Sequence, residues 1–275
     1  MTIHLIYDTI WIKEEGYFTN QKGKYMYSMV FDTETTDLNK CFCYDVGYLI
    51  FDTETAEIVL QKHFVIEQIW HNIELFQTAY YAEKRPLYIS LMRAKKATME
   101  KWGYVMQEMI RDIRKFNVTD AYAYNSSFDE KVFNYNCDWF KTQNPFDNVA
   151  IHDIWGYASE KITYTPEYKA FCEQNSNFTD SGNYKGSAES VYQYLTTTPD
   201  FVEEHMGLYD AQIELIILQK CVELGAEWAQ DYKVVNILPR TIPHPYVITV
   251  NGTVIHEGNY VKKTVYKDNF RFTEV

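Results

Sequence analysis

One stretch, Tyr25 to Thr36, constrains the fold of this chain more than any other. Its first part, Tyr25 to Phe31, is mostly apolar and includes aromatic residues, as in a strand buried on both faces near the centre of a sheet. Asp32 and Glu34 follow directly, and alternate residues of a strand point to the same face. Two carboxylates so close to a core repel each other, and a divalent cation such as Mg²⁺ or Mn²⁺ removes that penalty. An isolated pair of acids is also common at the solvated end of a strand, so the motif alone does not define a site.

The same motif occurs a second time. Phe51 to Thr55 repeats the five residues that begin at Phe31. An apolar stretch precedes this second copy and another, 58–66, follows it, which predicts two strands joined by a hairpin loop. We therefore expect its two acids, Asp52 and Glu54, to lie in water without a chemical role.

Composition narrows the class of protein. The 275 residues are 46% hydrophobic and 17% aromatic, enough for a full core. The formal net charge of −12 argues against a protein that coats long nucleic acid, but not against one that grips a few nucleotides. The five cysteines lack paired C-x-x-C spacing, so neither a zinc site nor a disulfide framework is expected.

The chain shows no signal peptide and no apolar run of about 20 residues, the length of a membrane helix. We expect no membrane association. The location that fits best is the reducing cytoplasm of a bacterium or of a phage-infected host cell.

Apolar spacing predicts an alternation of strands and helices. Three strands with short connections suggest an antiparallel meander. We expect strands near 25–33, 44–51, 57–66 and 118–124, and helices between Pro86 and Lys115, from Asn125 onward, and over 151–162, 166–174, 187–195 and 202–224.

The two ends of the chain differ from its middle. Residues 1–24 predict an added hairpin or edge strand. Three prolines follow Gly225, and Asn251-Gly252 then marks a two-residue hairpin turn. We expect an N-terminal extension at 1–24, a main domain at 25–225 and a C-terminal β-ribbon at 226–275, which could contact a partner protein.

Further acids follow other predicted element ends. Asp129 lies in the first turn of a helix, just after the strand over 118–124. His205 and Asp210 lie five positions apart near the start of the last long helix. An acid in a first helical turn is favoured by the helix dipole alone, so none of these residues is specific by itself.

Taken together and in order, these residues resemble the DnaQ-like DEDDh family of 3′–5′ exonucleases. The residues that carry the resemblance are F-D-T-E-T-T at 31–36, N-S-S-F-D at 125–129 and E-H-M-G-L-Y-D at 204–210, with S-A-E-S-V-Y-Q-Y-L at 187–195 and D-A-Q-I-E-L-I-I-L at 210–218 beside them. The resemblance spans about 28–224. It implies an α/β fold, an RNase H-like mixed β-sheet flanked by helices.

The resemblance also implies the chemistry. Two metal ions, Mg²⁺ or Mn²⁺, would flank the scissile phosphate. Asp32 would bridge both ions, Glu34 and Asp210 would hold the ion that activates water, and Asp129 would support the second. His205 would take the proton of the water as general base.

The resemblance implies a substrate as well. The expected activity releases nucleoside monophosphates from the 3′ end of a single-stranded nucleic acid, with DNA favoured. Thr35 and Asn125 are expected to contact the terminal nucleotide. One departure from the family is Gly207, where the family often has Ala; glycine lowers helix propensity by about 1 kcal/mol, and we expect a more mobile loop around His205.

Two alternatives stay open. The same chemistry could trim RNA, because recognition of the 2′-OH depends on details of the pocket. The chain could also be a non-catalytic module that binds nucleic acid or a partner, because a fold does not dictate activity.

Overall fold

The computed structural model describes residues 26–38, 40–180 and 182–234, and the strands 244–250, 253–260 and 272–274. The predicted N-terminal extension, 1–24, lies outside the described residues. The strands are β1 (Tyr27–Thr35), β2 (Cys43–Asp52), β3 (Ile58–Ile66), β4 (Thr98–Glu100), β5 (Asp120–Ala123), β6 (Ala150–Asp153), β7 (His244–Val250), β8 (Thr253–Tyr260) and β9 (Phe272–Glu274). The helices are α1 (Glu67–Trp70), α2 (Ile73–Phe76), α3 (Arg85–Arg93), α4 (Trp102–Phe116), α5 (Ser126–Phe140), α6 (Ile154–Ala158), α7 (Pro166–Gln174), α8 (Ala188–Thr196) and α9 (Gly207–Glu223), with a 3₁₀ turn at Ala82–Lys84 and a π turn at Ser159–Thr163.

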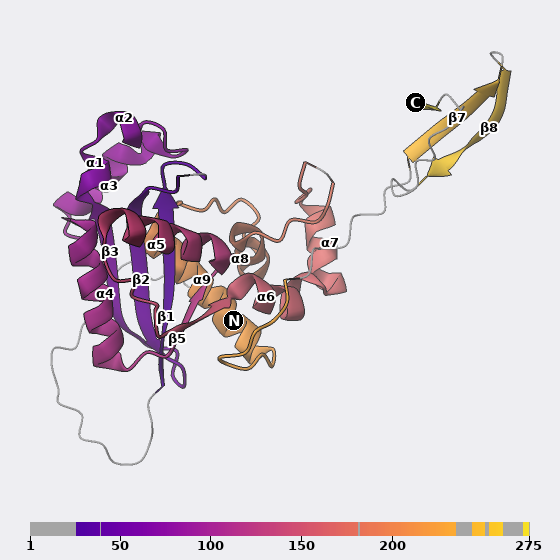
Figure 1. Ribbon diagram of the computed structural model, residues 1–275. Coiled ribbons are helices and arrows are strands. Elements are labelled where there is room, and N and C mark those ends of the chain that lie inside the picture. Colours follow the sequence, from indigo (N-terminus) through magenta and orange to yellow (C-terminus); the bar gives the residue numbers. More distant parts are fainter. Residues whose placement is uncertain are drawn as a thin grey trace.

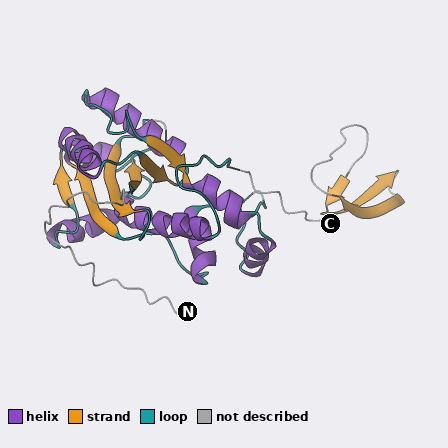
Figure 2. Cartoon of the chain, turned by 90° about the horizontal axis from the view of Figure 1, so that it is seen from below, coloured by secondary structure: helices purple, strands orange, loops and turns teal. Residues whose placement is uncertain are grey.

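A mixed sheet of six strands, in the order β4-β3-β2-β1-β5-β6, forms the centre of the main domain. The first three strands pair antiparallel, so the predicted meander is confirmed. β5 runs parallel to β1, and the edge strands β4 and β6 run parallel to β3 and β5. Helices lie on both faces of the sheet (Figures 1 and 2). The predicted fold, a mixed α/β sheet flanked by helices, is confirmed.

The two faces of the sheet have separate cores, because successive side chains of a strand point in opposite directions. Met29 and Phe31 of β1 pack with residues of α4 and α5. Val30, between them, belongs to the core that α8 and α9 share with the other face. By the same alternation, Asp32 and Glu34 lie on the α9 face of β1. A buried strand therefore leads directly to two acids beneath α9.

Two helical predictions were only partly right. The stretch from Pro86 to Lys115 is two helices, α3 and α4, separated by the short strand β4. The stretch 151–162 begins with β6, and helix follows from Ile154. Edge strands of three and four residues are too short to show a two-residue period, so the helical spacing of the residues around them dominated the pattern.

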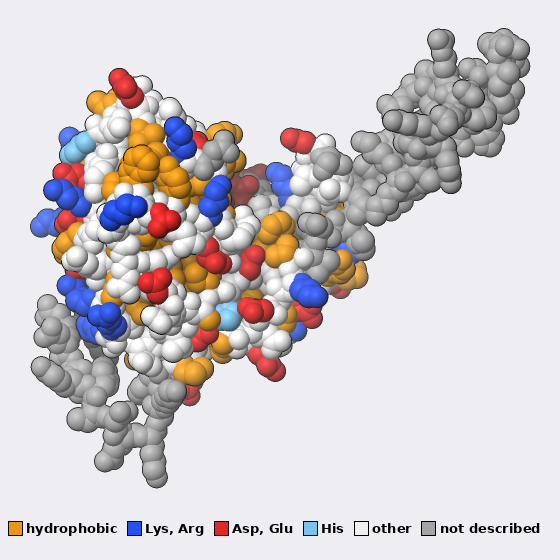
Figure 3. Space-filling model, viewed as in Figure 1, with side chains coloured by type: hydrophobic (Ala, Val, Ile, Leu, Met, Phe, Trp, Pro, Cys, Tyr) orange, Lys and Arg blue, Asp and Glu red, His pale blue; other side chains and the backbone are white. Residues whose placement is uncertain are grey.

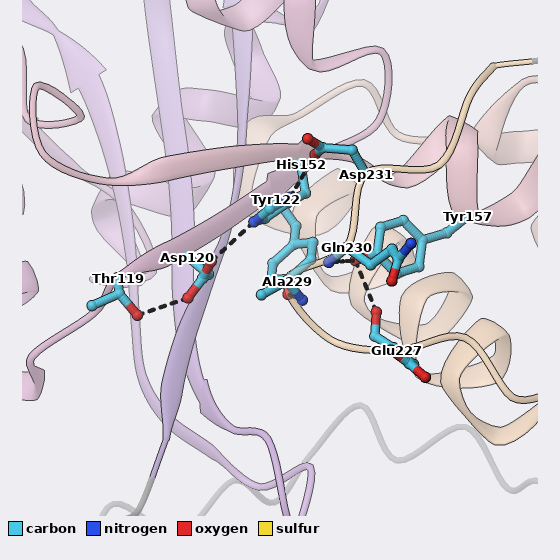
Figure 4. Close-up of polar contacts among 9 residues, drawn as sticks. All are labelled: Thr119, Asp120, Tyr122, His152, Tyr157, Glu227, Ala229, Gln230 and Asp231. Atoms are coloured by element: carbon cyan, nitrogen blue, oxygen red, sulfur yellow. Dashed lines mark hydrogen bonds and ion pairs between the residues drawn. The ribbon is translucent and has the colours of Figure 1, made fainter.

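The segment that follows α9 packs against the six-stranded sheet. Ala226 is buried, and the backbone N–H of Ala229 donates to the hydroxyl of Tyr122, at 2.9 Å. His152 on β6 lies between two carboxylates, with Nε2 2.9 Å from Asp120 and Nδ1 2.9 Å from Asp231 (Figure 4). These contacts hold the segment that follows α9 against β5 and β6.

Beyond that segment, β7 and β8 pair antiparallel, as the predicted C-terminal hairpin requires. β9 adds to β7 as a third strand. The division of the chain at residues 25 and 226, and a partner protein for the ribbon, stay predictions.

Within the described residues, no helix combines the length and the apolar character needed to cross a membrane. On the face that Figure 3 shows, acidic and basic side chains are interspersed.

Candidate active site

The site begins at the end of β1. In the antiparallel pairing of β1 with β2, Asp32 lies opposite Gly47 and Glu34 opposite Asp45, and a register shift follows between Glu34 and Thr35. Asp32 and Glu34 are both partly buried, and Oδ2 of Asp32 is buried without a hydrogen-bond partner. Asp32 and Glu34 therefore lie in the last regularly paired part of β1, on the face that α9 covers.

Helix α9 approaches these strands unusually closely. A Cβ added to Gly47 would lie 1.9 Å from the backbone N of Leu208, and one added to Gly207 would lie 2.9 Å from the backbone O of Asp32. Both positions therefore require glycine. The close contact between α9 and β2 explains why position 207 is glycine, whereas a more mobile loop does not. Asp210, in the first turn of α9, is brought to the two acids of β1.

Buried polar groups hold the start of α9 in place. One oxygen of Asp45 accepts the backbone N–H of Gly207 at 3.0 Å and the hydroxyl of Tyr88 at 2.6 Å. The other oxygen lies 2.8 Å from Nε2 of His63. Asp45 thus links β2 to α9 directly below the site.

Asp129 reaches the site from a third element, α5. Asn125, in the left-handed conformation with φ of 60°, turns the chain out of β5 and into that helix. Asp129 follows in the first turn, is buried, and its Oδ1 accepts a hydrogen bond from the hydroxyl of Thr33 at 2.6 Å. Asp129 is therefore fixed to the strand that carries Asp32 and Glu34.

The four predicted acids lie close enough together for the charges of Asp129, Asp210 and Glu34 to act on Asp32. Burial, and then the charges of Asp129, Glu214, Asp210 and Glu34, raise the pKa of Asp32 well above its usual range. Burial raises the pKa of Asp210 in the same way, and the charge of Glu203 adds to it. Burial raises the pKa of Glu34 to about 8 and that of Asp129 to about 7. Burial is the largest cause of the raised pKa of each of the four acids, because loss of solvent disfavours the ionised carboxylate.

His205 lies in the loop before α9, not in the helix. The predicted helix over 202–224 starts only at Gly207, and His205 has a φ of 47°. Its ring stacks on that of Tyr81 with centroids 4.2 Å apart. Burial, and then the charge of Lys84, lower the pKa of His205 below its usual value. A neutral imidazole beside the acids is available to accept a proton.

These residues offer ligands for a cation. Glu34, His205 and Asp210 each have a ligand atom, and the three atoms lie within 4.8 Å of one another. Oδ2 of Asp32 and Oδ1 of Asp210 are buried without hydrogen-bond partners. Carboxylate oxygens are the ligands that Mg²⁺ and Mn²⁺ favour, so the residues present fit such an ion.

The second copy of the motif does not join this site. Asp52 ends β2, and its Oδ1 accepts the backbone N–H groups of Glu54 and Thr55 at 2.8 and 3.0 Å. The expectation that Asp52 lies in water was wrong, because it is buried and caps the turn. Glu54 is exposed, as predicted.

The two predicted nucleotide contacts lie at the edge of the site. Thr35 is the last residue of β1 and is partly buried. Asn125 is exposed, and its backbone N–H donates to Asp153 at 2.9 Å. Their contact with a nucleotide stays a prediction.

Three residues near the site were not predicted from sequence. Tyr81 and Lys84 come from an irregular stretch before α3, where no periodic pattern indicates a contact with His205. Lys84 lies over the Tyr81 ring and donates to the backbone O of Glu204. Glu214, four residues after Asp210, could have been found, because residues with this spacing share a helix face.

The chain has the RNase H-like fold of 3′-exonucleases. One solved structure, described as 3′-end specific recognition of histone mRNA stem-loop by 3′-exonuclease, has a TM-score of 0.52 and 12% identity, over 90% of this chain and 95% of that one. A full-length 3′-exonuclease has a TM-score of 0.47 and 15% identity, over 82% and 72%. E. coli Exonuclease I in complex with a dA16 oligonucleotide has a TM-score of 0.44 and 14% identity, over 72% and 42%. No family model and no curated protein sequence matches the chain.

The raised pKa values predict how stability depends on pH when no cation is present. In the unfolded chain these carboxyls titrate near pH 4, whereas in the folded protein the pKa is about 8 for Glu34 and about 7 for Asp129. The folded state therefore binds more protons between these limits, and its stability falls as pH rises from about 4 to about 8. We expect urea unfolding in EDTA to give a free energy at least about 2 kcal/mol lower at pH 8 than at pH 5.

The control for this measurement is the same titration with excess Mg²⁺, in which the loss of stability at pH 8 should be smaller. A metal-free protein that is equally or more stable at pH 8 would contradict the prediction.

Proposed function

We propose that the chain is a divalent-cation-dependent 3′–5′ exonuclease of the DnaQ-like DEDDh kind. The observation that carries this proposal is the arrangement of Asp32, Glu34, Asp129 and Asp210. They come from β1, α5 and α9, and the charges of the other three acids act on buried Asp32. His205 lies beside Glu34 and Asp210. The RNase H-like fold adds support, because it is the fold of the exonucleases compared above.

The four acids would hold two cations, Mg²⁺ or Mn²⁺. Asp32 would bind both ions, Glu34 and Asp210 would hold one of them, and Asp129 would support the other directly or through water. The chemistry that such a pair supplies is charge stabilisation at the attacking and leaving oxygens of a phosphodiester. Thr33 would orient Asp129 through their hydrogen bond, and Asp45 would keep the start of α9 in place.

His205 would act as general base on the attacking water. Its lowered pKa keeps it neutral near pH 7, which is the form that accepts a proton. The Tyr81 ring fixes the plane of the imidazole, and Glu203 lies 3.9 Å from its Nδ1. A base held in one orientation loses less entropy when the water and the phosphate align.

We propose single-stranded DNA as the preferred substrate, with Thr35 and Asn125 at the terminal nucleotide. RNA is the second candidate. The structure with a TM-score of 0.52 is described with an mRNA stem-loop, but that description applies to that protein. A non-catalytic module would account less well for five chemically suited residues gathered in one place.

The decisive experiment compares digestion of one single-stranded oligonucleotide labelled at its 3′ end with the same strand labelled at its 5′ end. With Mg²⁺, we expect the 3′ label to be released at once as a mononucleotide and the 5′-labelled strand to shorten stepwise. EDTA should stop both. DNA and RNA strands of one sequence, digested side by side, decide the sugar preference. Early release of a mononucleotide from the 5′ end, or no digestion of either polymer, would reject the proposal.

A further inference from the structure

Glu214 is a buried acid to which neither the sequence motifs nor the roles proposed above assign a task. It lies on α9 one turn beyond Asp210, and positions four residues apart share a helix face. Its side chain is only 3% exposed. A glutamate buried to this degree normally has a partner of opposite charge.

The partners of Glu214 satisfy only half of its carboxyl group. It accepts a backbone hydrogen bond from Tyr124, the residue that follows β5 and precedes the start of α5. Its Oε2 is buried without any hydrogen-bond partner. The charges that act on Glu214 most strongly are those of Asp129, Glu203 and Asp210, and all three are negative. One oxygen is therefore anchored to the sheet, and the other is buried among acids.

Oε2 of Glu214 shares its lack of a hydrogen-bond partner with oxygens of two of the predicted acids. Among the described residues, Asp32 Oδ2, Asp210 Oδ1 and Glu214 Oε2 are all buried without partners. After that of Asp129, the charge of Glu214 acts on Asp32 more strongly than that of Asp210 or Glu34. One strand, β1, and one helix, α9, thus contribute three buried carboxylate oxygens without hydrogen-bond partners. A cation is the group that satisfies several such oxygens at once.

We propose that Glu214 is a fifth carboxylate of the candidate metal centre, on the side of Asp32 and Asp129, where it binds a divalent cation directly or through a water molecule. This inference rests on the proposed function, because it assumes that the acids hold cations. It assigns to α9 two ligands, Asp210 and Glu214, one turn apart. The hydrogen bond from Tyr124 orients the carboxylate, as groups around metal ligands do.

The test is Mn²⁺ binding to the purified full chain, measured by calorimetric titration without nucleic acid. The variant is Glu214→Gln, which keeps a carbonyl oxygen for the Tyr124 N–H and removes the charge. We expect the wild type to bind two Mn²⁺ ions and the variant to bind at least one of them about tenfold more weakly, the lower end of the effect of losing an outer metal-site group. Glu223→Gln, on the same helix but 66% exposed, is the control and should bind Mn²⁺ as the wild type does.

A second readout does not involve metal. In EDTA at pH 8, Glu214→Gln should unfold at a higher temperature than the wild type, because one of the repelling buried charges is gone. Its unfolding temperature should then rise less when Mn²⁺ is added. A role limited to the Tyr124 hydrogen bond would leave the response to Mn²⁺ unchanged.

The outcomes separate the two proposals. Binding by Glu214→Gln with the stoichiometry and affinity of the wild type overturns the assignment of Glu214 and leaves the four-acid centre standing. A wild type that binds no Mn²⁺ overturns both. If Glu214→Gln does not fold, Glu214→Asp replaces it: the retracted carboxylate should also weaken Mn²⁺ binding, and unchanged affinity rejects the assignment.

Discussion

Replacing Asp32 by Asn should reduce Mg²⁺-dependent digestion of a 3′ end by about a thousandfold or more. The side chain keeps its size but loses the charge that the proposed function places between two cations. Charge stabilisation by bound cations contributes several kcal/mol to such a reaction, and each ~1.4 kcal/mol corresponds to a factor of ten in rate. Initial rates of mononucleotide release from a labelled single strand measure the loss.

The chain supplies its own matched control for this variant. Asp52 occupies the same place in an identical five-residue motif, but its carboxylate caps a turn. Asp52→Asn keeps an oxygen for the two backbone N–H groups and should digest the substrate like the wild type. A variant of Asp32 that keeps more than a tenth of the activity, or an equal loss in Asp52→Asn, would show that the site was assigned to the wrong acids.

Replacing Gly47 by Ala should destabilise the protein by about 3 kcal/mol or more, the upper range for overpacking a core. The added methyl group would lie 1.9 Å from the backbone N of Leu208 and 2.0 Å from the backbone C of Gly207. Backbone atoms cannot rotate aside, so α9 itself must move away from β2. Asp210 and His205 would move with it, and activity should fall even at temperatures where the variant stays folded.

A second glycine provides the comparison for Gly47. Gly103 lies in the first turn of α4, and a Cβ there would meet only Thr142 Cγ2, at 3.5 Å. Gly103→Ala should therefore be neutral or stabilising by up to about 1 kcal/mol, because alanine favours helix. Chemical denaturation of both variants gives the two free energies. Equal stability of Gly47→Ala and the wild type would mean that α9 does not rest on β2 as described.

The sequence was sufficient to predict that the candidate acids lie at the ends of regular elements. A buried apolar strand leads into Asp32 and Glu34, and a short strand followed by a helix leads into Asp129. The periodicity of apolar residues locates the ends of strands and helices well. The order of the motifs along the chain then suggests that their acids lie together in the fold. The same reasoning predicted the meander and the C-terminal hairpin, because both depend on short connections.

The contacts that complete the site could not be predicted in this way. Gly47 and Gly207 are far apart in sequence, and only the crossing of α9 over β2 shows why both lack a side chain. Asp52 was predicted to lie in water because a polar loop follows it. In the structure its carboxylate accepts hydrogen bonds from the backbone of that loop. Glu214 was overlooked because the buried face of α9 was predicted from its apolar residues alone, although the four-residue spacing from Asp210 places Glu214 on the same helix face.

Asp32 and Asp210 of the candidate centre come from β1 and α9, which among the described residues are the first strand and the last helix. A cation bound to both Asp32 and Asp210 would therefore cross-link the two ends of the fold without a covalent bond. Such a cross-link stabilises the folded state in proportion to the logarithm of ion concentration. The concentration of free metal ion would therefore set the stability of the folded protein as well as the rate of the reaction.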